Sequence, residues 1–183
     1  MKFTLRRAGL EDALGLSRLA ADSFRETFTG TCTAADMEGY LRETYNEAAF
    51  RKLLEDESVF ILLGLDEEGQ MAGYAQWKTD APPFPFLGKN AVELQRLYVL
   101  KDYYGTGLAH LLMDAYEERA IAGGADTLWL GVWEFNYRAQ AFYKKRDFGP
   151  TGHSHPFPIG QTPQTDDWWV KRVQDLLSPR TAG

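Results

Sequence analysis

Strand-like and helical segments alternate along residues 91–148. The strand-like segments are AVELQRLYVL (91–100) and TLWLGVWEF (127–135), and helical patterns follow them at 105–123 and 136–148. A strand, a helix and a second strand in this order are typical of parallel pairing within one sheet. Because residues 91–100 end in an apolar run, we expect this strand at the centre of the sheet.

The rest of the chain adds helices and antiparallel hairpins to this unit. Thr33 and Asn46 are predicted N-caps of two helices. The other predicted elements are a first strand at 2–7, a helix at 10–28, a hairpin at 59–79, a Pro/Gly-rich loop at 80–90 and two closing strands at 153–157 and 165–173. In the helix at 105–123, the spacing predicts an inward face of Leu108, Leu111, Leu112, Ala115 and Tyr116. The sequence therefore predicts an α/β fold: a mixed sheet of about six to seven strands with helices on both faces.

Length and charge limit the classes of function. The 183 residues predict one domain at 1–175, followed by a tail at 176–183. Lys and Arg number 20 against 26 Asp and Glu, a net charge of −6. Nucleic-acid binding normally needs a basic face, so we expect no nucleic-acid partner. An acidic chain attracts cationic small molecules instead.

Cysteine, histidine and apolar content limit the location and the metal chemistry. Cys32 is the single cysteine, so a disulfide framework is impossible and the reducing cytoplasm is expected. No apolar run approaches the about 20 residues that span a bilayer, and the start lacks a signal-peptide pattern, so no membrane partner is expected. His110, His153, His155 and Cys32 lack metal-ligand spacing, and we expect no metal.

A glycine-containing turn links the predicted central strand to its helix. Gly105 and Gly107 permit positive φ and a close approach of backbone to a ligand. The free amides of the following helical turn and the helix dipole then favour an anion such as a pyrophosphate. No G-K-[ST] follows, so this is not a Walker P-loop. A turn that only reverses the chain is the alternative.

Two motifs together resemble the Gcn5-related N-acetyltransferase (GNAT) superfamily. Its pattern [Q/R]-x-x-G-x-[G/A] is matched by residues 104–109, with Tyr104 at the Gln/Arg position. Its pattern N-x-x-A-x-x-F-Y-x-x-x-G-F is matched by residues 136–148, with Asp147 at the Gly position, where Asp tolerates the left-handed conformation of a helix C-cap. Within the superfamily, the segments VELQRLYV, LWLGVWE and QTDDWW are similar to PaiA-type polyamine N-acetyltransferases.

The resemblance implies that acetyl-CoA is the co-substrate and that the amine attacks it directly, without an acyl-enzyme. Cys32 is then not needed as a nucleophile, and a packing role is its alternative reading. Backbone groups of Leu97, Tyr98 and Val99 are implied to hold the pantetheine arm, and Asn136, also a good helix N-cap, to bind the CoA arm. The implied pyrophosphate cradle consists of Gly105, Thr106, Gly107, Leu108, Ala109 and His110.

Two side chains are candidates for the proton transfers. Tyr143 stands where the superfamily carries a tyrosine close to the CoA sulfur, and its hydroxyl would protonate the thiolate. Its alternative role is packing beside Phe142. Glu93 on the central strand is the candidate base, and an ordinary outward-facing strand glutamate is the alternative.

The acceptor is expected to be a primary amine, with polyamines such as spermidine or spermine preferred. Predicted lining residues of an acceptor slot are Phe24, Phe28, Tyr40, Trp133 and Glu134. The loop at 80–90 is expected to cover the acceptor side. Acetylation of a protein or peptide and a non-catalytic acyl-CoA-binding sensor remain alternatives, and a homodimer is left open.

Overall fold

A seven-stranded mixed sheet forms the centre of the molecule in the computed structural model, which describes residues 1–79 and 84–173. The strands are β1 (Thr4–Arg7), β2 (Val59–Leu65), β3 (Met71–Lys78), β4 (Ala91–Val99), β5 (Thr127–Trp133), β6 (Gly149–Pro156) and β7 (Thr165–Arg172). The helices are α1 (Ala13–Phe28), α2 (Ala34–Thr44), α3 (Glu47–Glu55), α4 (Leu108–Ala122) and α5 (Tyr137–Lys145). The predicted tail at 176–183 and residues 80–83 of the predicted loop lie outside the described residues.

The strand order β1-β2-β3-β4-β5-β7-β6 confirms the predicted mixed sheet. Strand β4 occupies its centre and pairs in parallel with β5, while the other neighbouring pairs are antiparallel. The α4 connection between β4 and β5 produces the parallel pair, as the alternation of elements predicts.

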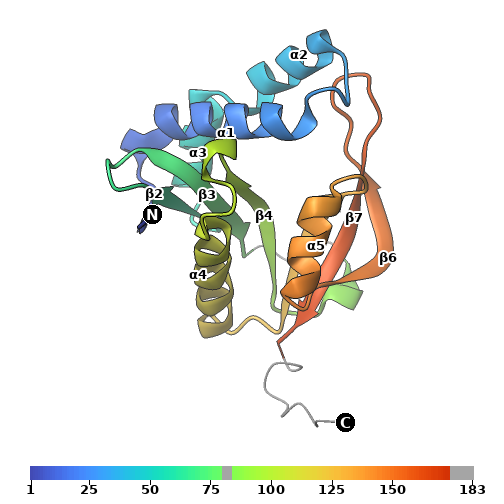
Figure 1. Ribbon diagram of the computed structural model, residues 1–183. Helices are drawn as coiled ribbons and strands as arrows, with labels where there is room; N and C mark the ends of the chain where they lie inside the picture. The colour runs from blue at the N-terminus through green and yellow to red at the C-terminus, as the bar shows by residue number, and fades with distance from the viewer. Residues whose placement is uncertain (80–83, 174–183) are drawn as a thin grey trace.

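Helices cover both faces of the sheet, as predicted (Figure 1). Strand β2 shows why: Ile61 and Leu63 pack with α1, α2 and α3, whereas Phe60 and Leu62 point to the opposite face. Helices α4 and α5 pack on that opposite face, with Leu112 and Tyr143 in its core. The two cores are therefore separated by the sheet.

Side-chain caps fix where three helices begin. Thr33, Asn46 and Asn136 accept hydrogen bonds from the backbone N–H of Asp36, Ala49 and Ala139. Each cap satisfies an amide that has no partner within the helix, and the sequence predicts all three.

The predicted inward face of α4 is wrong at one position. Leu108, Leu112 and Tyr116 are fully buried, but Leu111 is 43% exposed. The buried side chains lie about one turn apart along a stripe, and Leu111 lies about 60° around the helix from the Leu108 edge of that stripe. A leucine on the solvent side of a helix is ordinary, and apolar type alone does not identify the inward face.

Strands β4 and β5 pair over only part of their length. The parallel register joins Ala91–Leu94 to Thr127–Leu130 and then stops. On the other side of β4, Trp77 pairs with Leu94 and Gln76 with Arg96, so Gln95 is an extra residue. Such a β-bulge bends the strand that carries it. Residues 95–99 consequently have no partner in β5, and the sheet opens at its centre.

Candidate functional site

Two cavities meet in the opening between β4 and β5. The first cavity, of about 360 Å³, lies between the end of β4, the turn before α4, and α5. The second cavity, of about 200 Å³, is lined by residues of α1 and α2 and by parts of strands β4, β5 and β7. Their shared lining residues are Thr27, Leu97, Tyr98, Asn136, Ala139 and Tyr143. Molecules bound in the two cavities would therefore both be next to these shared residues.

The glycine turn forms one end of the first cavity. Gly105 and Gly107 have φ values of 76° and 91°, which only glycine adopts without strain. Gly107 precedes α4 without a side-chain cap, and the first turn of the helix holds no acidic residue. The amide of His110 donates to the carbonyl of Gly107 at 3.0 Å. The amides of Leu108 and Ala109 precede it, have no carbonyl partner within the helix and remain donors for an anion.

Most of the predicted cofactor-binding residues come together around the first cavity. Its lining includes Leu97, Tyr98, Val99, Gly105, Gly107, Leu108, Ala109, His110, Asn136 and Tyr143. Thr106 is not part of the lining, because its hydroxyl donates to the carbonyl of Tyr103 at 2.7 Å. Asp147, after α5, has a φ of 65°, the left-handed conformation that the sequence predicts for it.

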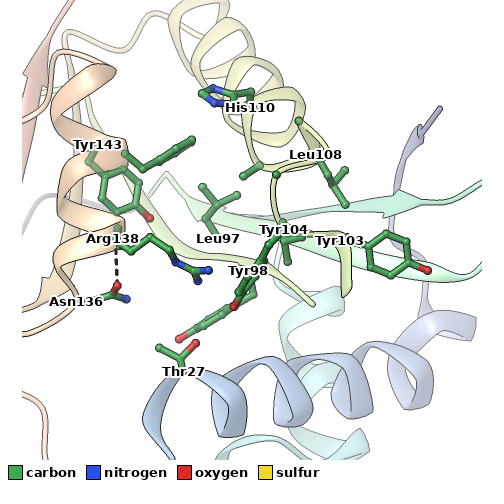
Figure 2. A pocket seen from close by; sticks show the side chains of 16 residues that line it. Thr27, Leu97, Tyr98, Tyr103, Tyr104, Leu108, His110, Asn136, Arg138 and Tyr143 are labelled. Carbon is green, nitrogen blue, oxygen red and sulfur yellow. Dashed lines mark hydrogen bonds between the residues drawn. The ribbon is translucent and has the colours of Figure 1, made fainter. Parts of the chain in front are cut away.

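Arg138 brings a positive charge to the glycine turn from α5. Its guanidinium carbon lies 3.8 Å from the centroid of the Tyr104 ring, a cation–π contact (Figure 2). Tyr104 stands at the motif position where a Gln or Arg is usual, so the cation beside the turn comes from another element. Sequence reasoning did not select Arg138, although it lies only two residues after Asn136.

Tyr143 points from α5 into the first cavity (Figure 2), and it lines the second cavity as well. The residue is buried, and burial, assisted by the charge of Asp166, raises the pKa of its hydroxyl well above the ordinary value. Tyr143 therefore holds its proton throughout the physiological pH range. Asn136 faces the same space, with its side-chain oxygen occupied by the amide of Ala139 at 3.1 Å.

Aromatic rings form the wall of the second cavity. Four of the five predicted lining residues are present: Phe24, Phe28, Tyr40 and Trp133. The ring of Phe24 stacks on Phe28 and Tyr40 at centroid distances of 4.4 and 5.0 Å. Glu134 is not in the lining, so its predicted place in the slot is not what the structure shows.

Two charged side chains, Asp166 and Arg96, line the second cavity. Burial, with a smaller effect of the adjacent Asp167, raises the pKa of the Asp166 carboxyl to about 7. The guanidinium of Arg96 donates to Oε1 of Gln76 at 2.8 Å and lies over the ring of Tyr45. Within residues 1–79 and 84–173, Arg96 forms no ion pair with a carboxylate.

Glu93, the predicted base, lies in the paired part of the sheet. It is opposite Trp129 of β5 and Lys78 of β3, before the bulge, and lines neither cavity. Its Oε2 accepts a hydrogen bond from Nε2 of Gln95 at 3.1 Å. Asp166, which sequence reasoning missed as a site residue, is the carboxylate that lines the second cavity.

Other chemistries find little support among the residues described. No group of three or more His, Cys, Asp or Glu side chains that could hold a metal ion occurs in the described ranges. Cys32 is half-buried, and burial raises the pKa of its thiol. No helix in the described part of the chain is long and apolar enough to cross a membrane.

Comparisons with known proteins give consistent results. The profile of the "Acetyltransferase (GNAT) family" matches residues 20–148. An uncharacterised N-acetyltransferase of Lactobacillus delbrueckii subsp. lactis is 33% identical over 159 residues, 86% of this chain and 88% of that protein. One of Mycobacterium tuberculosis is 31% identical over 165 residues, 90% and 99% of the two chains.

The fold resembles solved structures. The crystal structure of PaiA N-acetyltransferase from Thermoplasma acidophilum in complex with coenzyme A superposes with a TM-score of 0.78 at 20% identity, covering 94% of this chain and 99% of that one. A GCN5-related N-acetyltransferase structure from Rhodopseudomonas palustris has a TM-score of 0.73 at 21% identity, with 94% and 97% covered. At these identities the likeness establishes the fold.

Proposed function

Since the chain belongs to the GNAT acetyltransferase family, it is an N-acetyltransferase with acetyl-CoA as donor, and we propose that the acceptor is the primary amine of a small alkylamine. Polyamines such as spermidine and spermine are the preferred class of acceptor. The observation that carries this proposal is the pair of cavities that meet at Tyr143 and at Leu97 and Tyr98 of β4. One cavity suits the donor, and the other suits an amine with an apolar chain.

The residues around the first cavity fit acetyl-CoA. The amides at the start of α4 and the guanidinium of Arg138 suit the pyrophosphate. Beyond the bulge, the edge of β4 has no partner in β5, so its backbone groups are open to an amide-containing chain such as pantetheine. An added Cβ on Gly105 or Gly107 would meet no atom within 4 Å, which agrees with an open cradle at the turn.

Two features of the second cavity support an alkylammonium acceptor. Its aromatic faces attract cations, and Asp166 supplies a carboxylate. The net charge of −6 also favours a cationic substrate at long range. The resemblance of the segments VELQRLYV, LWLGVWE and QTDDWW to PaiA-type polyamine N-acetyltransferases also supports this class.

Arg96 favours a second acceptor class, amines that also carry a carboxylate. A half-buried guanidinium without a carboxylate partner in the described residues is suited to bind an anion. Trp133 contributes another donor to the same cavity, because its buried indole N–H has no hydrogen-bond partner there. An amino acid would place its amine near Asp166 and its carboxylate near Arg96.

Thiol release from acetyl-CoA by the purified protein tests the acceptor class. The panel contains spermidine, spermine, monoamines, free amino acids and peptides with a free N-terminus. We expect amine-dependent release with the highest kcat/KM for polyamines. A preference for amino acids would replace the polyamine proposal with the second class. Release only with peptides, or none despite acetyl-CoA binding, would identify the protein as a peptide acetyltransferase or a sensor.

Replacing Gly107 by alanine is expected to weaken acetyl-CoA binding about tenfold or more. A non-glycine residue at a φ of 91° has a backbone strain of roughly 1–2 kcal/mol. The turn relieves this strain by a backbone change that alters the direction of its N–H groups. Loss of one hydrogen bond to a charged group accounts for the tenfold change. Calorimetric titration with acetyl-CoA measures it.

Gly69 provides the matched control. It has a φ of 77° in the turn between β2 and β3, lines neither cavity, and like Gly107 has no atom within 4 Å of an added Cβ. Gly69→Ala should therefore lower stability by a similar amount and leave the dissociation constant of acetyl-CoA unchanged. Equal weakening by both variants would show that the glycine turn has no specific role in binding.

A further inference from the structure

The carboxylate of Asp166 lies over Gly131 and lines the second cavity. It lies at the start of β7, opposite Trp133 of β5 and His155 of β6. Its Oδ2 is 3.3 Å from the position that a Cβ on Gly131 would occupy, and Gly131 also lines the cavity. Because Gly131 lacks a side chain, the carboxylate can lie over the surface of β5 and face the cavity.

The neighbouring carboxylate, Asp167, is differently placed. Side chains alternate along β7, so Trp168 and Val170 lie on the face of Asp166, whereas Trp169 packs in the core under α4 and α5. Asp167 belongs to the second set and is absent from the lining of both cavities. The side chains of the two adjacent aspartates therefore lie on opposite faces of the sheet.

Among the described residues around Asp166, no cation forms an ion pair with its carboxylate. From the surrounding elements, Arg96 of β4, Tyr40 and Tyr45 at α2, and Tyr143 of α5 line the same cavity. His155 of β6 approaches the same Gly131, and its Nδ1 accepts a hydrogen bond from the indole of Trp168. Among the residues with described coordinates, Asp166 has no ion pair and no side-chain hydrogen bond. A largely buried carboxylate in this state favours a cationic ligand.

We propose that Asp166 binds the ammonium group of the acceptor and is the base that removes its proton before acetyl transfer. The inference rests on the function proposed above and holds for either acceptor class. It assigns the base to β7 instead of to Glu93 of β4, which lines neither cavity.

The proton and bond changes balance as follows. The ammonium R–NH₃⁺ gives one proton to the Asp166 carboxylate and becomes R–NH₂. The amine nitrogen then bonds to the thioester carbonyl carbon, the C–S bond breaks, and Tyr143 donates its proton to the sulfur. The nitrogen returns a second proton to the Tyr143 oxygen directly or through water. Asp166 releases its proton to solvent, so one proton leaves for each acetylamine and CoA thiol formed.

The acidity of Asp166 suits this role. Burial raises the pKa of its carboxyl to about 7, so the carboxylate form is present at physiological pH and is more basic than an exposed aspartate. Because the base must be deprotonated, kcat/KM for the amine should rise with pH through about 7.

The test compares D166N with D167N, the same isosteric change one residue away. We expect D166N to lower kcat/KM for the best amine by about 10²-fold or more and to remove the rise near pH 7, with the KM of acetyl-CoA unchanged. D167N should retain the rate and a rise with pH, its midpoint somewhat lower because the charge of Asp167 contributes to the raised pKa of Asp166. Glu93→Gln is measured as the rival variant: loss of the rise in E93Q with its retention in D166N overturns the proposal.

A second readout does not depend on any acceptor. In protein labelled with ¹³C at aspartate carboxyls, the resonance that D166N removes should titrate near pH 7, and a midpoint below about pH 5 overturns the inference. Failure of the proposed function is recognised separately, because the unsubstituted enzyme then acetylates no amine. An enzyme whose D166N variant stays within threefold of it retains the proposed function and refutes Asp166 as the base.

Discussion

Replacing Tyr143 by phenylalanine is expected to lower kcat by about 10²-fold or more while the dissociation constant of acetyl-CoA stays within about twofold. The hydroxyl lies where the two cavities meet, and burial keeps it protonated. Phenylalanine retains the ring that packs against Phe142 and Phe148, so the fold and the cavity shape are preserved. In the acid role expected of Tyr143, only the proton for the departing thiolate is lost. Steady-state kinetics and calorimetry with acetyl-CoA separate the two quantities.

Tyr137 supplies the control for this variant. It lies on the same helix, is 68% exposed and lines neither cavity. Tyr137→Phe should leave both kcat and acetyl-CoA binding unchanged. If Tyr143→Phe retains full turnover, the hydroxyl is not the acid and Tyr143 has only a packing role.

D166N is also expected to stabilise the protein at pH 8 relative to the unsubstituted chain, by about 4 kcal/mol in the free energy of unfolding. The native pKa of Asp166, about 7, lies above the ordinary value of 3.8, so the native state binds the proton more tightly than the unfolded state. The contribution of this carboxyl group to the free energy of unfolding is fully present below pH 3.8 and is lost as pH rises through about 7. A shift of this size corresponds to a few kcal/mol, at 1.36 kcal/mol per unit.

Urea unfolding at pH 8 and pH 5 measures this effect. The advantage of D166N should be largest at pH 8 and clearly smaller at pH 5, where more of the native carboxyl is already neutral. D167N should show a much smaller difference between the two pH values, because the charge of Asp167 has only a secondary effect on the pKa of Asp166. An equal stability change for D166N at both values would mean that the buried carboxylate has no unfavourable ionisation, and the basis for its raised pKa would be lost.

Local patterns were sufficient to predict the scaffold and most of the residues that surround the first cavity. The turn at Gly105 and Gly107 follows the central strand directly in sequence, and the caps at Thr33 and Asn136 depend on bonds to residues three positions away. Such features depend on neighbours along the chain, so spacing predicts them. Leu111 was misplaced because an apolar residue does not reveal which side of a helix it occupies.

The acceptor side depends on contacts between distant segments. Asp166 meets Gly131 and the rings of α1 and α2 only because β7 pairs with β5. Its sequence neighbour Asp167 looks equivalent in the sequence and lies on the other face. Glu93 was selected because it is on β4, but its position relative to the bulge places it in the paired part of the sheet. Neither fact follows from residue type or spacing.

The early end of pairing between β4 and β5 has a mechanical consequence. The parallel register that joins the N-terminal strands to the C-terminal strands at the centre of the sheet contains four residue pairs. Beyond these pairs the two halves of the sheet are separated by the cavities, so the halves could rotate relative to each other about the four pairs. A donor molecule that spans the gap ties the halves together on the far side of the pivot. Acetyl-CoA bound across the gap would thus hold the two halves of the sheet together, and its release would leave them free to move relative to each other.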